Sequence, residues 1–539
     1  MIPTEYLQQM RLSAGSRPWE EVPEEEKRLL FRHLILTDLT FVCHLTGATP
    51  ILTESHYKQL IPFVDNPNDE HRQILGFRDY GKTTVIRAKI IQTFLRNPNS
   101  RILFVSATKE FSYTQVGAIA DELKLNDIWA WAFPEIVWQD MERKHLHERG
   151  MKGEQPKRWS RKALQVKRSI RVPEATVTAG TLDPMPTGGH FTHIFFDDLV
   201  NPENSQNRDL IEKVITQFNY FYSIVTSPNQ NIALEGPMFV SGTIYDKDDL
   251  NAKLKKDKEY KTLTIPCYLD QETAKALGKV YIKGVKVPTC PERFTVELLE
   301  KKRSRIGDYM FSCQYLLEPW DAKASLFKKE WLAQTYKSLP ENIKFALVFD
   351  PAGHTKTNTG ECTILIVAID EKLNVYFYAA NRGLFTAKEM GMIVNMQRKI
   401  IRGLFGSPPE VGMEKAGLQE AFKSVIEQES DESFVIYDLR HGNRHWFVRA
   451  LPMATRAQNM QLYFPDPEIY PEEQWWADAL KDQLLFTTKG QDKGERDWWD
   501  CAGYIDQMIT KHHCRPPLTG DKAYTGTDGM EIDDDIIGY

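Results

Sequence analysis

The residues of the first half best suited to chemistry form the stretch GFRDYGKT, from Gly76 to Thr83. It matches G-x-x-x-x-G-K-[ST], in which backbone N–H groups surround phosphates, the lysine reaches the β and γ oxygens, and the hydroxyl binds Mg²⁺. A strand-like segment precedes it and a segment with helical spacing follows, as the motif requires. The stretch therefore predicts a nucleotide site at Gly76, Gly81, Lys82, Thr83 and Thr84; the alternative is a turn with an exposed lysine.

A pair of acids ends the apolar run HIFFDD, at Asp197 and Asp198. In P-loop enzymes the first acid at such a strand end holds Mg²⁺. The second would polarise the attacking water as a general base. A solvated acidic turn is the alternative for this pair. Further along, Ser241 or Thr243 in VSGTIYD could sense the γ-phosphate, and Arg78 inside the glycine–lysine stretch could contact it, unless Arg78 is an ordinary loop cation.

Four acids of the second half stand where a metal-dependent site could form. Asp350 ends the apolar run FALVFD, Glu414 ends EVGME, and Asp497 and Asp500 flank two tryptophans in DWWD. If the last segment is helical, its i, i+3 acids lie on one side. Carboxylates from two strands and a helix could hold two Mg²⁺ or Mn²⁺ ions about 4 Å apart for phosphodiester hydrolysis. Strand-end acids that are merely solvated are the alternative.

The elements that must position these residues alternate in the first half. Apolar runs at 101–107, 192–198 and 236–243 suit buried parallel strands, with helical segments between them, and residues 20–46 have a helical pattern. This alternation predicts a parallel sheet covered by helices. Near residue 320 the pattern changes, and strand-like runs at 344–352, 362–370 and 373–381 follow one another closely. A second α/β domain with an antiparallel start is expected there, with further strands at 409–417 and 434–439.

Composition sets the broad class. The chain has 539 residues, 42% hydrophobic and 26% charged, which is ordinary for a globular protein of about two to four domains. No apolar run is long enough to cross a bilayer, and the N-terminus lacks a signal layout, so we expect a soluble intracellular protein. Seven scattered cysteines without a C-x-x-C pair argue against disulfides or a zinc knuckle.

Charge is unevenly distributed along the chain. The net charge is −6, yet eleven Lys and Arg residues lie between Arg143 and Arg171. Such a cluster can attract the phosphates of DNA, although a solvated face is an equal alternative. The last residues, GMEIDDDIIGY, are acidic and are expected to be mobile.

In this order the motifs resemble those of the large terminase subunit of tailed bacteriophages, the motor that packages DNA into an empty procapsid. The stretches that carry the resemblance are FRDYGKT, HIFFDD, SGTIYD, FDPAG, GMEKAG and DWWDCA, within about residues 55–512. Residues 289–321 are similar to the lid between ATPase and nuclease, and residues 447–464 are similar to the basic stretch before the last nuclease acid. The resemblance implies an ASCE-type P-loop ATPase with a parallel sheet, followed by an RNase H-like nuclease with a mixed sheet.

The resemblance also implies roles. Lys82 and Thr83 would bind ATP·Mg²⁺ with Asp197, Asp198 would be the catalytic carboxylate, and Arg78 the loop arginine; the nuclease triad would be Asp350, Glu414 and Asp497, with Asp500 a less certain ligand.

The sequence departs from the family pattern at several positions. Many relatives have Glu where Asp198 stands, and Arg496 occupies one place of a pair of adjacent acids. Glu361 alone matches a further family acid, and Gln59 and Gln73 are weak candidates for the glutamine that contacts adenine.

The family layout predicts an N-terminal helical segment at 1–50, an ATPase domain at 51–260, a lid at 261–335, a nuclease domain at 336–515 and a flexible tail at 516–539. Expected partners are double-stranded DNA, the portal protein, the small terminase subunit and further copies in a ring on the portal, in the host cytoplasm beside the procapsid. A helicase-nuclease of DNA repair is the alternative, although no second RecA-like domain is evident. A binding protein with a degenerate P-loop would not be expected to keep Lys82, Thr83 and Asp197 intact.

Overall fold

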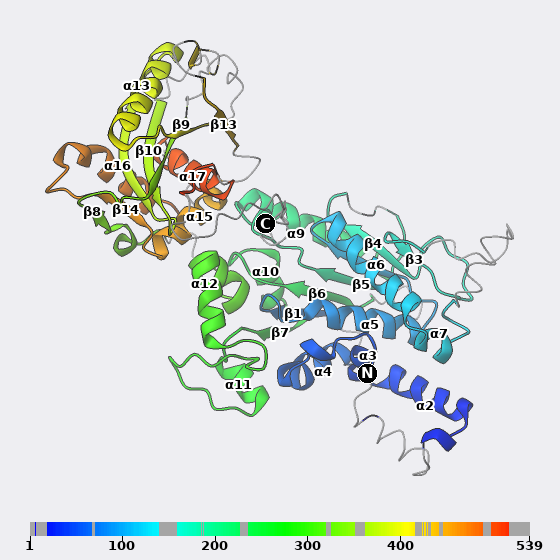
Figure 1. Cartoon of the computed structure of the whole chain (residues 1–539). Coiled ribbons are helices and arrows are strands. Elements are labelled where there is room, and N and C mark those ends of the chain that lie inside the picture. The colour runs from blue at the N-terminus through cyan, green and yellow to red at the C-terminus, as the bar shows by residue number, and fades with distance from the viewer. Residues whose placement is uncertain are drawn as a thin grey trace. The chain divides into compact units, whose positions relative to one another are not determined.

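The computed structural model divides the chain into two compact units (Figure 1). The first comprises Met1–Glu300 with Ser312–Trp320, and the second comprises Lys301–Phe311 with Asp321–Tyr539. Helix α12 (Val296–Phe311) therefore carries the chain from one unit into the other, and its helical backbone is interrupted at Gly307, where φ is 80°. The structure describes residues 6, 19–66, 71–138, 159–184, 186, 188–226, 236–319, 325–350, 362–414, 423, 425–426, 428, 433–440, 446–488, 497–511 and 513–516.

A seven-stranded sheet with the order β3-β4-β2-β5-β6-β1-β7 forms the core of the first unit. Its pairings are parallel, except that β3 runs antiparallel to β4. The apolar runs expected as strands are confirmed, and most of their residues are buried on both faces. The strands are β1 (His71–Gly76), β2 (Ile102–Ser106), β3 (Ala163–Leu164), β4 (Val177–Thr181), β5 (His193–Asp197), β6 (Met238–Gly242) and β7 (Tyr260–Ile265).

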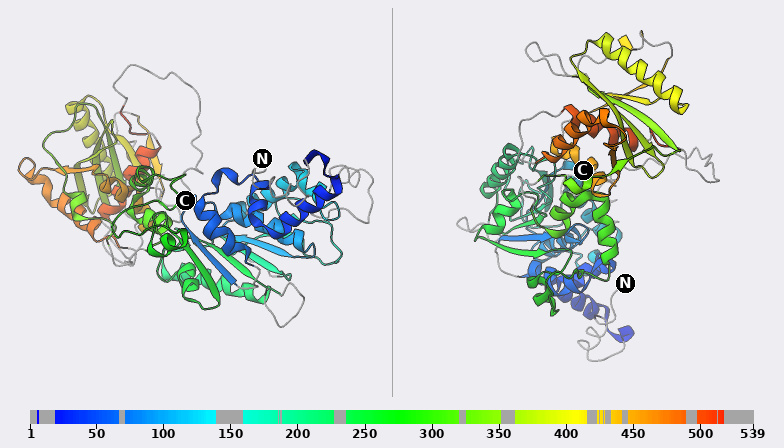
Figure 2. Two further views of the ribbon diagram at one scale, coloured as in Figure 1. Left: turned by 90° about the horizontal axis from the view of Figure 1, so that it is seen from below. Right: turned by 90° about the vertical axis from the view of Figure 1, so that its left-hand side faces the viewer.

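Helices cover both faces of this sheet. Figures 1 and 2 show α5 and α6 on one face and α9 and α10 on the other. Strand β6 lies between β1, which leads into the glycine–lysine loop, and β5, which ends in Asp197. This insertion is the arrangement of ASCE P-loop ATPases, so the fold class predicted for the first half is confirmed. The helices are α4 (Ile61–Asp65), α5 (Lys82–Arg96), α6 (Lys109–Leu125), α7 (Ile128–Ala132), α9 (Arg208–Asn219), α10 (Leu250–Lys256) and α11 (Gln271–Leu277).

The N-terminal segment, for which the sequence predicts helical structure over residues 20–46, forms two helices. Helix α2 (Glu24–Thr37) ends before Asp38, whose backbone is extended and whose carboxylate caps α3 (Leu39–Leu45) by accepting from the N–H groups of Thr40 and Phe41. A side-chain cap of this kind begins a new helix.

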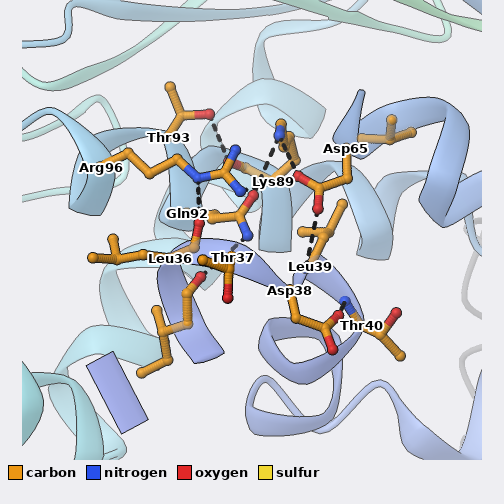
Figure 3. A network of polar contacts seen from close by, with 12 residues as sticks. Leu36, Thr37, Asp38, Leu39, Thr40, Asp65, Lys89, Gln92, Thr93 and Arg96 are labelled. Atoms are coloured by element: carbon orange, nitrogen blue, oxygen red, sulfur yellow. Dashed lines mark hydrogen bonds and ion pairs between the residues drawn. The ribbon is translucent and has the colours of Figure 1, made fainter. Parts of the chain in front are cut away.

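These helices pack against α5, the helix that follows the glycine–lysine loop (Figure 3). The ammonium of Lys89 on α5 is 2.8 Å from the carboxylate of Asp65, which also contacts Arg96 at 3.3 Å and the N–H of Leu39 at 3.3 Å. The side chain of Gln92 donates to the carbonyl of Ile35. Burial lowers the pKa of Lys89 to about 8, while the charge of Asp65 opposes this shift. The polar network thus ties the helices before the sheet to the helix of the candidate nucleotide site.

A second seven-stranded sheet, β13-β12-β9-β10-β11-β14-β8, forms the core of the second unit. Strands β9, β10 and β11 pair antiparallel in succession, as expected, and β12 runs parallel to β9 and to β13. This mixed sheet is RNase H-like, which confirms the fold class predicted for the second half. The strands are β8 (Thr335–Tyr336), β9 (Ile343–Asp350), β10 (Cys362–Asp370), β11 (Val375–Gly383), β12 (Glu410–Glu414), β13 (Ile436–Leu439) and β14 (Leu462–Pro465).

Helix α13 (Ala387–Phe405) covers one face of this sheet, and α17 (Asp497–Thr510) covers the other (Figure 2). The residues of β9 that pack in the α13 core are Phe345, Leu347 and Phe349, and those of β12 are Val411 and Met413. Because side chains alternate along a strand, Asp350 and Glu414 belong to the α17 face. Helices α15 (Trp446–Gln458) and α16 (Gln474–Leu485) pack against α17.

Gly412 on β12 shows how closely α17 approaches the sheet. A Cβ at this position would lie 2.8 Å from the sulfur of Met508 on α17 and 2.6 Å from Cδ1 of Leu439. A larger residue would therefore push the helix away from the strand ends that carry the two acids.

All seven cysteines lie in the described part of the chain, where each is buried and none forms a disulfide.

Within the described residues, no helix combines the length and the apolar character needed to cross a membrane.

Candidate functional site

The glycine–lysine loop, residues 77–81, connects β1 to α5. Gly81 has φ of 107°, a conformation that L side chains rarely adopt, and α5 begins at the next residue. A Cβ on Gly76 would lie 2.9 Å from Cδ of Lys82. The side chain of Lys82 can therefore lie across the loop only because residue 76 is a glycine. The Lys82 ammonium is buried and donates to the carbonyls of Gly76 at 2.7 Å and Phe77 at 3.4 Å. The loop thus holds a buried cation at the N-terminus of a helix, an arrangement that can bind phosphate.

Asp197 meets this loop although it is 114 residues from Thr83 along the chain. The Thr83 hydroxyl donates to one carboxylate oxygen at 2.6 Å, and the Ser241 hydroxyl on β6 donates to the other. Burial, together with the charge of Asp198, raises the pKa of Asp197 to about 6, while the two hydroxyl hydrogen bonds act in the opposite direction. A hydroxyl beside a buried carboxylate offers the oxygen ligands that Mg²⁺ prefers, and a cation there would favour the ionised acid.

Asp198 differs from its neighbour in exposure and backbone. It is exposed, has φ of 49°, and its N–H donates to the carbonyl of Ser241 at 3.0 Å. Arg78 is exposed as well, whereas Thr84 is half-buried in the first turn of α5. An exposed carboxylate directly after a buried one can reach water that the buried one cannot.

The glutamines proposed for adenine contact have other partners. Gln73 is fully buried in β1, where its amide donates to the carbonyl of Asn251 and accepts from the hydroxyl of Thr262. Gln59 donates to the hydroxyl of Ser55 at 3.2 Å. Thr243, the second candidate for sensing the γ-phosphate, has its carbonyl bound by the amide of Asn251.

Sequence reasoning missed two residues that contact the loop from other segments. His56 stacks on the ring of Tyr80 with centroids 4.2 Å apart, and the guanidinium of Arg293 donates to the carbonyls of Asp79 and Tyr80. No local signal identifies Arg293, because 213 residues separate it from Tyr80 and its own surroundings carry no motif for phosphate.

In the second unit, two acids lie side by side at the ends of neighbouring parallel strands. Met413 is paired with Phe349, so Glu414 and Asp350 are the next residues of β12 and β9. Tyr504 on α17 hydrogen-bonds Glu414, and burial raises the pKa of its phenol with further contributions from Glu414, Asp350 and Asp500. Burial also raises the pKa of the Cys501 thiol, again with contributions from Asp350, Asp500 and Glu414. The charges of the three acids therefore act on the same face of α17.

Asp500 has a basic partner. Its carboxylate is 2.9 Å from the guanidinium of Arg449 on α15, and both side chains are about one-fifth exposed, at 19%. Asp497 begins α17, but its side chain, like Arg496 and Glu361, lies outside the described part of the chain. Within the described part, no three His, Cys, Asp or Glu side chains form a metal cluster. The predicted set of Asp350, Glu414 and Asp497 therefore stays a prediction.

Part of the basic cluster at 143–171 is engaged in internal contacts. The ammonium of Lys167 donates to the carbonyl of Pro134 and lies over the ring of Trp138, and Arg168 donates to the carbonyls of Val172 and Glu174. Residues 139–158, which hold most of the remaining charge, lie outside the described part of the chain. The predicted contact between this cluster and DNA stays a prediction.

No protein-family model and no curated protein matches the sequence. Among solved structures, the chain is similar to the large terminase of a thermophilic bacteriophage, with TM-score 0.47 and 10% identity over 85% of this chain and 99% of that one. It is also similar to the large terminase of bacteriophage HK97, with TM-score 0.30 and 11% identity over 83% and 94%. The terminase nuclease domain of human cytomegalovirus matches with TM-score 0.29 and 10% identity over 35% and 100%. The first two are large terminases of bacteriophages, the family that the sequence motifs resemble.

Proposed function

We propose that the chain is a viral DNA-packaging motor that hydrolyses ATP in its first unit to move double-stranded DNA into a procapsid. The observation that carries the proposal is the 2.6 Å hydrogen bond between the Thr83 hydroxyl and Asp197. It joins the end of the glycine–lysine loop to the end of β5, which is where a P-loop ATPase assembles its Mg²⁺ ligands.

This geometry supports the following roles for residues of the first unit. Backbone N–H groups between Gly76 and Thr83 would bind the phosphates, and Lys82 would exchange its two loop carbonyls for β- and γ-phosphate oxygens. Thr83 and Asp197 would hold Mg²⁺, which supplies charge neutralisation on the triphosphate. Asp198, exposed at the strand end, would accept a proton from the attacking water, and Arg78 would contact the γ-phosphate.

The second unit supports a second activity on the same DNA. Asp350 and Glu414, on neighbouring strand ends, would be the main ligands of a divalent-metal pair that cleaves phosphodiester bonds, with Asp497 as the third. Both are oxygen donors on the α17 face, a donor set that suits Mg²⁺ or Mn²⁺. Asp500 is a weaker candidate because Arg449 neutralises its charge. The nuclease would cut concatemeric DNA that the motor loads.

An assay for packaging separates this function from its alternative. Purified protein, ATP and Mg²⁺ are incubated with procapsids and linear double-stranded DNA, and nuclease-protected DNA is measured beside strand unwinding of a forked duplex. The proposal predicts ATP-dependent protection that Lys82→Ala abolishes, with no unwinding. ATP-dependent unwinding without protection would favour the helicase-nuclease alternative.

A further inference from the structure

The outer side of the phosphate-binding loop is held by residues from the segment 289–315, which nothing in the motif predicts. Arg293 donates from one guanidinium nitrogen to the carbonyl of Asp79 at 2.9 Å. Its other terminal nitrogen donates to the carbonyls of Tyr80 at 3.1 Å and Ile51 at 3.2 Å. One rigid fork thus binds two successive loop peptides, a geometry that a lysine could not reproduce.

Two further contacts act on the same loop residues. The Tyr315 hydroxyl donates to the carboxylate of Asp79 at 3.2 Å, and the N–H of Arg78 donates to the carbonyl of Gln314 at 2.9 Å. Asp79 has φ of 65°, a left-handed conformation that is uncommon for residues other than glycine. Arg293 binds the backbone carbonyl of Asp79 and Tyr315 binds its carboxylate, so both contacts stabilise this conformation.

His56 completes the arrangement at the next peptide. The N–H of Thr53 donates to Nδ1 of His56 at 3.1 Å, so Nδ1 is an acceptor and Nε2 carries the proton that is donated to the Tyr80 carbonyl at 2.7 Å. Burial lowers the pKa of His56 to about 4, so the ring stays neutral. The Tyr80 carbonyl therefore receives two donors, one from His56 and one from Arg293.

The consequence lies on the opposite side of the peptide. A trans peptide is planar, with its C=O and N–H pointing in opposite directions. A Tyr80 carbonyl fixed toward Arg293 and His56 turns the N–H of Gly81 away from those two residues. In a phosphate-binding loop such an N–H is a ligand of the nucleotide.

We propose that Arg293 is a positioning residue for nucleotide binding, which fixes the Asp79–Tyr80–Gly81 backbone so that the Gly81 N–H faces the phosphates. Tyr315 supports the same conformation through the Asp79 carboxylate. The inference rests on the proposed ATPase function. It assigns to the segment around Arg293 a direct part in forming the nucleotide site.

The test compares four variants by the Kd for a fluorescent ATP analogue, by steady-state kcat and KM, and by thermal unfolding. Arg293→Ala is expected to raise the Kd and KM about tenfold, the cost of losing a charged hydrogen bond, with a smaller change in kcat. Arg293→Lys should recover part of the loss. Tyr315→Phe, which removes a single hydroxyl, should raise the KM by a smaller factor. Arg208→Ala, which changes an exposed side chain at the start of α9, is the matched control and should bind ATP like the wild type.

Chemical rescue makes the readout specific. Guanidinium at millimolar concentration should lower the KM of Arg293→Ala and leave Arg208→Ala unchanged. A wild-type Kd and KM in both Arg293→Ala and Tyr315→Phe would overturn the inference. If Arg293→Ala does not fold, a wild-type Kd and KM in Tyr315→Phe alone would overturn it. Lys82→Ala distinguishes failure of the proposed function from failure of the inference about Arg293. ATPase activity that survives in Lys82→Ala refutes the proposed function. If Lys82→Ala loses ATPase activity while Arg293→Ala binds and hydrolyses ATP like the wild type, only the role of Arg293 is refuted.

Discussion

At the scale of single residues, the adjacent acids Asp197 and Asp198 have different surroundings. Asp197 is buried and accepts hydrogen bonds from two hydroxyls, whereas Asp198 is exposed with a left-handed backbone. A buried acid with fixed donors suits a static ligand, and an exposed neighbour suits proton transfer.

This difference predicts separate effects of two substitutions. Asp198→Asn should bind ATP with nearly wild-type Kd but lose turnover, because the amide keeps the shape and loses the base. Asp197→Asn should weaken Mg²⁺-dependent ATP binding itself. Binding of the fluorescent analogue and single-turnover hydrolysis measure the two effects. Turnover that survives in Asp198→Asn would place the general base at another residue.

Asp500 offers a second prediction at this scale. Because Arg449 holds its carboxylate at 2.9 Å, Asp500→Asn should slow Mn²⁺-dependent plasmid cleavage only partially. Glu414→Gln, at a strand end beside Asp350, should abolish it, since a shared metal pair would lose a ligand. Equal loss in the two variants, with unchanged thermal unfolding, would make Asp500 a main ligand.

At the scale of elements, the helices before the sheet are part of the core of the first unit. The ion pair between Lys89 on α5 and Asp65 at the end of α4 joins them, and the two side chains are 8% and 18% exposed. Helices α2 and α3 pack against α5, the helix of the candidate nucleotide site (Figure 3). A partner that binds these two helices would therefore contact elements that touch α5 directly.

Asp65→Asn should destabilise the first unit by about 3 kcal/mol at pH 6, because the buried charge of Lys89 loses its partner. The pKa of Lys89 in the folded protein is about 8, below its ordinary value of 10.5. Between pH 8 and 10.5 the unfolded chain therefore binds more protons than the folded protein, and the free energy of unfolding rises with pH in this range. The substitution lowers this pKa further, so its cost should shrink as the pH rises from 6 to 9. Urea unfolding at both pH values measures this, and a cost that grows with pH would contradict it.

At the scale of the whole molecule, local patterns predicted much of what the structure contains. The strand before GFRDYGKT, the acids at the ends of β5, β9 and β12, and the antiparallel start of the second sheet all follow from apolar runs and their endings. The alternation of side chains along β9 and β12 then determines which face of the sheet carries Asp350 and Glu414.

The contacts that the sequence did not predict are long-range. Arg293 reaches the loop from 213 residues away, and the pairing of Asp500 with Arg449 depends on how α15 packs against α17. Tertiary packing decides these contacts, and no periodicity along the chain encodes them.

The central claim is that one chain carries two separate sites, an ATPase in the first unit and a nuclease in the second. The most direct measurement assays ATP hydrolysis and DNA cleavage in parallel for the wild type, Lys82→Ala and Glu414→Gln. Lys82→Ala should lose hydrolysis and keep metal-dependent cleavage, because its ammonium donates to two carbonyls of the loop in the first unit. Glu414→Gln should lose cleavage and keep hydrolysis. Loss of both activities in either folded variant, or hydrolysis that survives in Lys82→Ala, would contradict the account.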